Sequence, residues 1–249
     1  MHLPIADKCN IKCKHCRSDS YCSNENFQQT FPGQAREVIT PQEAFERVCG
    51  LKKDNENYKV VGFAGPGDPL ANPYELFKTV ELVRNQYSDI EFCISTNGLE
   101  VQKYLYELMF YGIKYITITI NTLNADIGAQ IYDWCLSGKK VLYAKSAATN
   151  IIEAQRTAVE ELNKHKEFLV KVNTVYIPEV NSLDIENIID FINENGVYIY
   201  NLVPLVGENI KNNNLIKQEV ALLRKKYSNL TNVMMHCKQC RSDDISKIV

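Results

Sequence analysis

Apolar residues follow two alternating rhythms along this chain of 249 residues. Short apolar runs, such as the one at 58–64, have the length of strands, whereas segments such as 73–87 repeat their apolar positions with the period of a helix. The pattern predicts strands at 2–7, 58–64, 91–95, 114–121, 168–177 and 197–205, and helices at 41–51, 73–87, 101–111, 125–136, 150–165, 182–195 and 217–227. Strands that alternate with helices pair in parallel with right-handed crossovers. We therefore expect an α/β fold, a partial TIM-like (βα)6 barrel of about six units.

Helix ends are marked by local signals. Thr40 can cap a helix whose first residue is Pro41, and Glu43 occupies the capping-box position. Ser182 is expected to cap the helix that Gly196 ends, and a further glycine, at 138, is expected to end the helix at 125–136. The polar stretch at 18–37 is expected to be an irregular loop.

Composition narrows the class of protein. The formal net charge of −2 gives no basic surface for nucleic acid. No apolar run has the length of a membrane span, and the first nine residues lack the pattern of a secretory signal, so we expect a cytoplasmic, monomeric protein without membrane contact. No low-complexity linker divides the chain, which predicts a single domain over 1–249 with a C-terminal tail at 228–249.

Nine cysteines are an odd number for a reducing compartment and indicate metal ligands rather than disulfide bonds. Cys9, Cys13 and Cys16 form a CxxxCxxC run directly after the first predicted strand. Three thiolates on one loop can ligate three irons of a [4Fe-4S] cluster and leave the fourth iron open for a chelating amine and carboxylate. A zinc site is the alternative, but the second cysteine pair that zinc needs is not near in sequence. The run resembles that of radical SAM (S-adenosylmethionine) enzymes, which implies a cluster that binds S-adenosylmethionine.

Other polar motifs also follow predicted strands, where the reactive groups of such barrels lie. Gly65 and Gly67 would let a ligand approach the backbone, and Asp68 could accept a hydrogen bond from its ammonium group; an ordinary Pro-Gly turn is the alternative. The further candidates for cofactor binding are Ser95, Asn97, Thr119, Asn121 and Asn173.

The motifs, taken in order along the chain, resemble the NifB family of nitrogenase iron-molybdenum cofactor biosynthesis. They are HLPIA at 2–6, CNIKCKHC at 9–16, CSNE at 22–25, AGPGDPLANP at 64–73, STNGL at 95–99, TITIN at 117–121, VNTV at 172–175, NLVPL at 201–205 and HCKQCRSD at 236–243. The cysteine loop alone is shared by many families, whereas GPGDPLANP, CSNE and the terminal CxxCRxD together are specific.

This resemblance implies three [4Fe-4S] clusters. One binds and cleaves S-adenosylmethionine, and two are substrates that become an eight-iron, carbide-centred precursor of the nitrogenase cofactor. One S-adenosylmethionine donates the methyl group that ends as the carbide, and a second supplies a 5′-deoxyadenosyl radical. Iron–sulfur cluster donor proteins and a downstream cofactor carrier or scaffold are the implied partners.

The resemblance also implies further metal ligands and one catalytic residue. The implied ligands are His2, Cys22, Cys93, Cys237 and Cys240. By their residue types alone, His2 could be a frayed terminus, Cys93 a buried strand residue, and the CxxC pair a zinc or redox site. Two other cysteines, 49 and 135, fall in predicted helices and are expected to pack as small apolar residues.

Glu25 is the implied proton acceptor for the methyl group, with a solvated loop glutamate as its alternative. His15 stands where the superfamily usually places an aromatic ring against the adenine. The family's further cysteine, in a segment ahead of the HLP stretch, has no counterpart in this sequence. Two alternatives stay open: a radical SAM enzyme with an organic substrate and one auxiliary cluster, and a non-catalytic cluster carrier.

Overall fold

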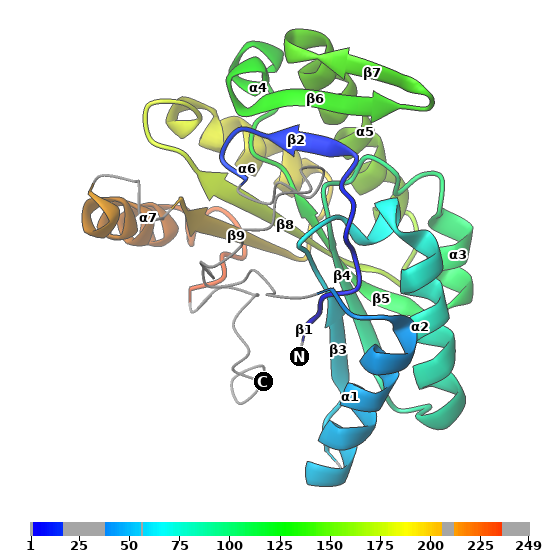
Figure 1. Ribbon diagram of the computed structural model, residues 1–249. Helices are drawn as coiled ribbons and strands as arrows, with labels where there is room; N and C mark the ends of the chain where they lie inside the picture. Colours follow the sequence, from blue (N-terminus) through cyan, green and yellow to red (C-terminus); the bar gives the residue numbers. More distant parts are fainter. Residues whose placement is uncertain (1, 17–37, 56, 206–211, 236–249) are drawn as a thin grey trace.

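A parallel sheet forms the centre of the fold (Figure 1). The structure is a computed structural model, and it describes residues 2–16, 38–55, 57–205 and 212–235. The sheet has six strands in the order β1-β3-β4-β5-β8-β9. They are β1 (His2–Leu3), β3 (Val60–Phe63), β4 (Glu91–Thr96), β5 (Ile113–Thr119), β8 (Leu169–Tyr176) and β9 (Ile199–Pro204). Every pair is parallel, and the order is linear with β1 and β9 at the edges, which confirms the predicted partial barrel.

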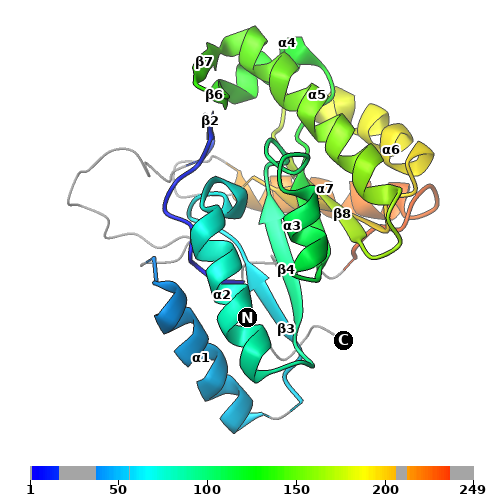
Figure 2. The ribbon, with the colours of Figure 1, turned by 90° about the vertical axis from the view of Figure 1, so that its right-hand side faces the viewer.

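Helices connect the strands and cover one face of the sheet (Figure 2). The helices are α1 (Pro41–Asp54), α2 (Pro73–Gln86), α3 (Leu105–Phe110), α4 (Ala125–Ile131), α5 (Ala144–Asn163), α6 (Ile185–Glu194) and α7 (Asn213–Tyr227), with 3-10 turns η1 (Pro69–Ala71) and η2 (Ser182–Asp184). Along β4, Phe92 and Ile94 are buried in the main core, whereas Cys93 and Ser95 on the opposite face stay partly exposed. This second face is therefore the one that can meet a ligand.

The predicted start of α1 is confirmed. Thr40 Oγ1 accepts a hydrogen bond from Glu43 N (3.2 Å), and the Glu43 carboxylate accepts from Thr40 N (2.8 Å), with Pro41 as the first helical residue. The later helix is different, because Ser182 begins η2 rather than capping, and α6 starts at Ile185.

The predicted helix at 125–136 is wrong in its second half. The helix α4 ends at Ile131, and the chain continues as a hairpin of β6 (Tyr132–Ser137) and β7 (Lys140–Tyr143), with Gly138 at φ +60° in the turn. The strand β6 pairs antiparallel with β2 (Ile11–Cys13), so a distant segment decides its conformation. The cysteine at 135 is accordingly a buried residue of β6 rather than of a helix.

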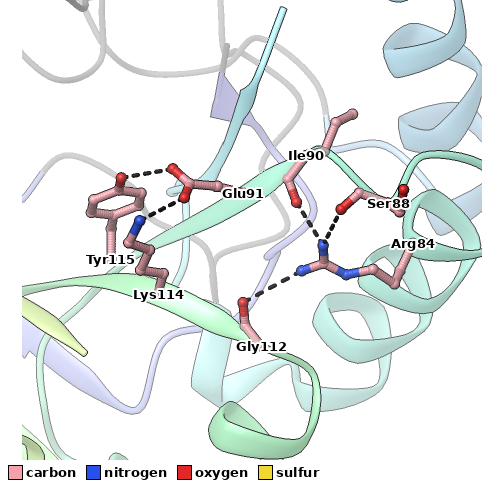
Figure 3. Close-up of polar contacts among 7 residues, drawn as sticks. All are labelled: Arg84, Ser88, Ile90, Glu91, Gly112, Lys114 and Tyr115. Atoms are coloured by element: carbon pink, nitrogen blue, oxygen red, sulfur yellow. Dashed lines mark hydrogen bonds and ion pairs between the residues drawn. The ribbon is translucent and has the colours of Figure 1, made fainter. Parts of the chain in front are cut away.

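The amino ends of β4 and β5 are tied together by side chains of α2, β4 and β5 (Figure 3). The guanidinium of Arg84 donates to the carbonyl oxygens of Ile90 (2.8 Å), Ser88 (3.2 Å) and Gly112 (3.5 Å). Nearby, the Glu91 carboxylate accepts from Lys114 Nζ (2.6 Å) and Tyr115 Oη (2.7 Å). These contacts lie at the opposite end of the strands from the cysteine loop.

The beginning of the predicted tail runs beside the edge strand β9. Tyr200 N donates to Asn232 O and Tyr200 O accepts from Met234 N, both at 2.8 Å. Val233 forms the bridge to Tyr200, so the chain reaches residue 235 along this edge of the sheet.

Candidate functional site

The cysteine loop is anchored to the small antiparallel sheet. Cys13 is the last residue of β2 and pairs with Tyr132 of β6. The carbonyl oxygen of Asn10 accepts from Leu136 N (2.8 Å), and Cys16 N donates to the carbonyl oxygen of Cys13 (3.0 Å). The hairpin that the sequence did not predict therefore fixes the backbone on which the three thiols stand.

Gly67 packs against the backbone just ahead of Cys9. A Cβ atom at Gly67 would lie 2.1 Å from the carbonyl oxygen of Lys8. Gly67 N donates to Ala6 O and Asp68 N donates to Lys8 O, both at 2.8 Å. The absent side chain thus serves an approach between two segments of the chain, whereas a contact of this glycine with a cofactor stays a prediction.

Asp68 joins the loops that follow β3 and β4. The residue is only 4% exposed, and its carboxylate accepts from Thr96 Oγ1 (2.9 and 3.0 Å), Asn97 N (2.6 Å) and Leu70 N (2.9 Å). Burial raises the pKa of this carboxyl group, while the hydrogen bonds from Asn97 and Leu70 act in the opposite direction. These bonds fix the loop after β3 to the loop after β4, next to the cysteine loop.

Asn97 is bonded through all four of its polar groups. Its N–H donates to the Asp68 carboxylate, and its carbonyl oxygen accepts from Gln155 Nε2 (2.8 Å). The side-chain Oδ1 accepts from Leu99 N (2.9 Å). The side-chain Nδ2 donates to Asn10 Oδ1 (2.6 Å) and to Cys9 Sγ (3.8 Å). Asn97 is therefore the direct link between the end of β4 and the first predicted cluster ligand.

Gln155, a residue of α5, is a part of the site that the sequence did not indicate. It is fully buried, and its Nε2 donates at 2.8 Å to the carbonyl oxygens of both Asn97 and Thr119. Gly98, with φ +90°, makes room for it, because a Cβ there would lie 3.1 Å from Gln155 Cγ. One amide group thus ties the carboxyl ends of β4 and β5 to the helix.

The thiol of Cys9 is strongly affected by its surroundings. Burial, followed by the negative charge of Asp68, raises the pKa of this thiol to about 12. Hydrogen bonds from Ile11 N and from the Asn97 side chain act in the opposite direction. The nearby Cys16 raises the pKa further. The surroundings thus disfavour a bare thiolate and suit one whose charge is shared with a metal.

Among the predicted cofactor residues of the later strands, Thr119 ends β5, Asn121 follows two residues later, and Asn173 lies in the carboxyl half of β8. Asn121 Oδ1 accepts from Val175 N (2.9 Å), and the Asn121 carbonyl oxygen accepts from Asn181 Nδ2 (2.8 Å). Asn173 Oδ1 accepts from Asn201 Nδ2 (2.9 Å). The side-chain amides of Asn121 and Asn173 thus connect neighbouring segments of the sheet. Their contacts with a cofactor stay predictions.

His2 and Cys93 lie in one row across the partly exposed face of the sheet. Gly62 is the register partner of both residues, on β1 and on β4. A Cβ at Gly62 would lie 2.4 Å from Cδ2 of the His2 ring, so the imidazole covers this glycine. Cys93 is the third residue of β4 rather than a loop residue, and the sheet brings it to the same side as the imidazole.

The remaining described candidates lie in β4 and in two turns. Ser95 lies on the partly exposed face of β4, Gly65 (φ +27°) lies in the turn after β3, and His15 lies in the turn after β2. The candidates Cys22, Glu25, Cys237 and Cys240 lie outside the described residues.

The donor set fits an iron–sulfur cluster. Three thiols stand on one eight-residue loop, and thiolates are the usual ligands of such clusters. The Nδ2 of Asn10, next to Cys9, is buried and has no hydrogen-bond partner in the described chain, so it is available to a bound group. The six cysteines that the structure describes form no disulfide with one another. Among all described residues, no three His, Cys, Asp or Glu side chains lie close enough together to form a metal site.

Residues 3–192 match the family model of the radical SAM superfamily. The match covers most of the chain and includes the cysteine loop, the loops after β3 and β4, and every strand of the six-stranded sheet except β9, with β1 included from Leu3. The chain belongs to the radical SAM superfamily.

Within this superfamily the chain is similar over its length to FeMo cofactor biosynthesis proteins NifB. It is 35% identical to NifB of Klebsiella pneumoniae, with 100% of this chain and 54% of that protein covered, and 35% identical to NifB of Chlorobaculum tepidum, with 100% and 58% covered. Identity with NifB of Azotobacter vinelandii is 33%, with 100% and 50% covered. The chain thus spans about half the length of the curated relatives it matches.

Solved structures share the fold at low identity. Streptococcus suis SuiB bound to S-adenosylmethionine matches with a TM-score of 0.60 at 14% identity, over 93% of this chain and 48% of that one. The protein anSMEcpe with bound AdoMet and Cp18Cys peptide gives 0.62 at 15% identity, over 93% and 62%. Methylornithine synthase (PylB) gives 0.59 at 15% identity, over 93% and 63%. In the described part of the chain, no helix combines the length and apolarity needed to cross a membrane.

Proposed function

We propose that the chain is a radical SAM enzyme of nitrogenase cofactor biosynthesis that converts two [4Fe-4S] clusters into an eight-iron, carbide-containing precursor. The observation that carries the proposal is the similarity to NifB proteins over the whole of this chain. It is supported by the cysteine loop, in which Cys9 accepts a hydrogen bond from Asn97. Since the relatives are about twice as long, the activity of the complete NifB protein is part of the proposal and not of the comparison.

Cys9, Cys13 and Cys16 would hold the resident [4Fe-4S] cluster. When bound, this cluster would supply reductive cleavage of S-adenosylmethionine at its C5′–S bond, to methionine and a 5′-deoxyadenosyl radical, with one electron from a protein electron donor. A first S-adenosylmethionine would give its methyl group to a sulfide of the substrate clusters and leave as S-adenosylhomocysteine, and one hydrogen atom of that methyl group would be lost to the radical, giving 5′-deoxyadenosine. The two remaining hydrogens would leave as protons, for which Glu25 is the proposed acceptor, and the electrons that make the carbon a carbide would come from the substrate clusters as its bond to sulfur is replaced by bonds to iron.

The substrate clusters need ligands of their own. His2 and Cys93, which share a row on the partly exposed face of the sheet, are proposed as two of them. Cys22, Cys237 and Cys240 are proposed as the others. Cluster donor proteins and a carrier for the product are the proposed partners.

Iron content and EPR spectra of the anaerobically reconstituted chain, with and without S-adenosylmethionine, test the proposal. We expect about twelve irons per chain, from three four-iron clusters, and formation of 5′-deoxyadenosine. About eight irons would instead favour an enzyme with an organic substrate and one auxiliary cluster. About four irons without 5′-deoxyadenosine would contradict the proposal.

A further inference from the structure

Asn97 is placed to act on the thiolate of Cys9. Its Nδ2 lies 3.8 Å from Cys9 Sγ, within the range of a hydrogen bond to sulfur, and its second proton is used on Asn10 Oδ1 (2.6 Å). The residue is only 8% exposed, so little water competes for the donor.

Three hydrogen bonds hold Asn97 in place, two through its backbone and one through its side chain. Asp68, after β3, accepts from Asn97 N at 2.6 Å, and Gln155, on α5, donates to its carbonyl oxygen at 2.8 Å. Leu99 N donates to Asn97 Oδ1 at 2.9 Å, which fixes the side-chain rotation and thus directs Nδ2 towards the cysteine loop. The donor is therefore held in place before any group is bound.

A donor fixed beside a ligating sulfur changes the energy of the group that the sulfur holds. Reduction adds negative charge to an iron–sulfur cluster, part of which resides on the thiolates. A hydrogen bond to such a sulfur stabilises that charge, so its removal makes reduction less favourable.

We propose that Asn97 is a positioning residue of Cys9 whose amide hydrogen bond to Sγ raises the reduction potential of the cluster at Cys9, Cys13 and Cys16, with Gln155 and Asp68 holding the amide in place. The inference rests on the cluster-binding part of the proposed function and is independent of the substrate. It gives Asn97 of the STNGL motif an electronic role at the cluster, in place of the contact with the cofactor that the sequence predicts.

The chain offers a matched control. Asn150, also on α5, donates through Nδ2 to the Sγ of Cys135 at 3.6 Å, and this thiol is not among the predicted ligands. Asn97→Leu and Asn150→Leu therefore each remove one amide-to-thiol hydrogen bond, but only the first removes a bond to a predicted cluster ligand. Asn97→Ser is a second test variant, because its hydroxyl can still accept from Leu99 N but is too short to reach Cys9.

The test is EPR-monitored reduction of the reconstituted full chain at stepped potentials, with iron content measured in parallel. For Asn97→Leu and Asn97→Ser we expect unchanged iron content and, at the potential where the wild type is half reduced, about a tenfold lower ratio of reduced to oxidised cluster, which is about 59 mV for one electron. Gln155→Met is expected to shift the ratio in the same direction by a smaller factor, and Asn150→Leu is expected to leave it unchanged.

Each outcome decides a different claim. If either Asn97 variant retains its cluster and reduces at the wild-type potential, the inference is wrong. If Asn150→Leu shifts the potential as much as Asn97→Leu, the effect is a general loosening and the inference is again wrong. A wild type that forms no four-iron cluster would instead overturn the proposed function.

Discussion

Gly67 leaves no room for a side chain beside the carbonyl oxygen of Lys8. A Cβ at this position would lie 2.1 Å from that oxygen, so Gly67→Ala must push the two segments apart and weaken the hydrogen bonds between them. We expect a loss of about 1–3 kcal/mol in the free energy of unfolding, as for other overpacked sites. Iron uptake on reconstitution should also fall, because Cys9 follows Lys8 directly. Urea unfolding and iron analysis measure the two effects.

Gly50 provides the control for this substitution. It lies inside α1, and a Cβ there would meet nothing within 4 Å. Gly50→Ala should therefore stabilise the chain by about 0.5–1 kcal/mol, since alanine is the better helix former. Equal effects of the two substitutions would contradict the structural reason given for Gly67.

Single residues also show how far the sequence can be read. The sequence identified Asp68 and Asn97 as members of the site, but it suggested contacts with a ligand, whereas the structure shows both bonded to other parts of the chain. Gln155 was missed, because a lone glutamine in a helical segment is normally solvent-exposed and only the tertiary fold buries it. Roles that depend on bonds between distant segments leave no local pattern to recognise.

Among the elements, α2 is attached to the amino ends of β4 and β5 through Arg84. The guanidinium contacts three carbonyl oxygens (Figure 3). It also lies 4.7 Å from the centre of the Phe92 ring. A lysine cannot reproduce this fork, so Arg84→Lys should lower the free energy of unfolding by about 1–2 kcal/mol. Thermal or urea unfolding measures the change.

A second cation of α2 serves as the comparison. Lys78 pairs with Glu81 at 2.9 Å, three residues along the same helix, and both side chains are largely exposed. Lys78→Met should change the free energy of unfolding by less than about 0.5 kcal/mol. A cost as large as that of Arg84→Lys would show that the charge of α2, rather than the carbonyl contacts, determines its stability.

Glu91 should make the stability of this end of the sheet depend on pH. Hydrogen bonds from Lys114 and Tyr115 lower the pKa of this carboxyl group below its ordinary 4.5. The stabilisation is therefore complete above the pKa of the unfolded chain and is lost as the pH falls through the lower pKa of the folded state. Glu91→Gln should destabilise the chain at neutral pH by at most about 1 kcal/mol, because the side chain is 39% exposed and solvent screens the pair. Urea unfolding of both proteins at neutral pH and near pH 3.5 checks this, and a difference that persists unchanged in acid would argue against it.

The order of elements was predictable, but the small sheet was not. Each strand of the parallel sheet has an apolar run of its own, and Thr40 predicts the start of α1 from the local sequence alone. The segment at 132–137 has a pattern that suits either conformation, and its pairing with β2, more than a hundred residues away, makes it a strand. The site is therefore supported by a small sheet that local patterns could not reveal.

At the scale of the whole molecule, the two ends of the described chain lie at opposite edges of one sheet. β1 forms one edge, with the cysteine loop beyond it, and the stretch that leads to residue 235 runs along β9 at the other edge. Ligands from the two ends of the chain could thus serve separate clusters on one scaffold.

The proposed separation of clusters gives a final prediction. Replacing Cys237 and Cys240 with alanine should remove about four irons per chain and abolish the eight-iron product. Formation of 5′-deoxyadenosine should persist, because Cys9, Cys13 and Cys16 belong to the other end of the chain and are held by β2 and Asn97. Cys49→Ser is the control, since this cysteine lies in α1 and should leave iron content unchanged. Iron analysis and product assays on the reconstituted proteins measure each effect. An eight-iron product from the double variant would exclude the tail from the substrate site, whereas loss of 5′-deoxyadenosine would mean that the two ends of the chain do not act independently.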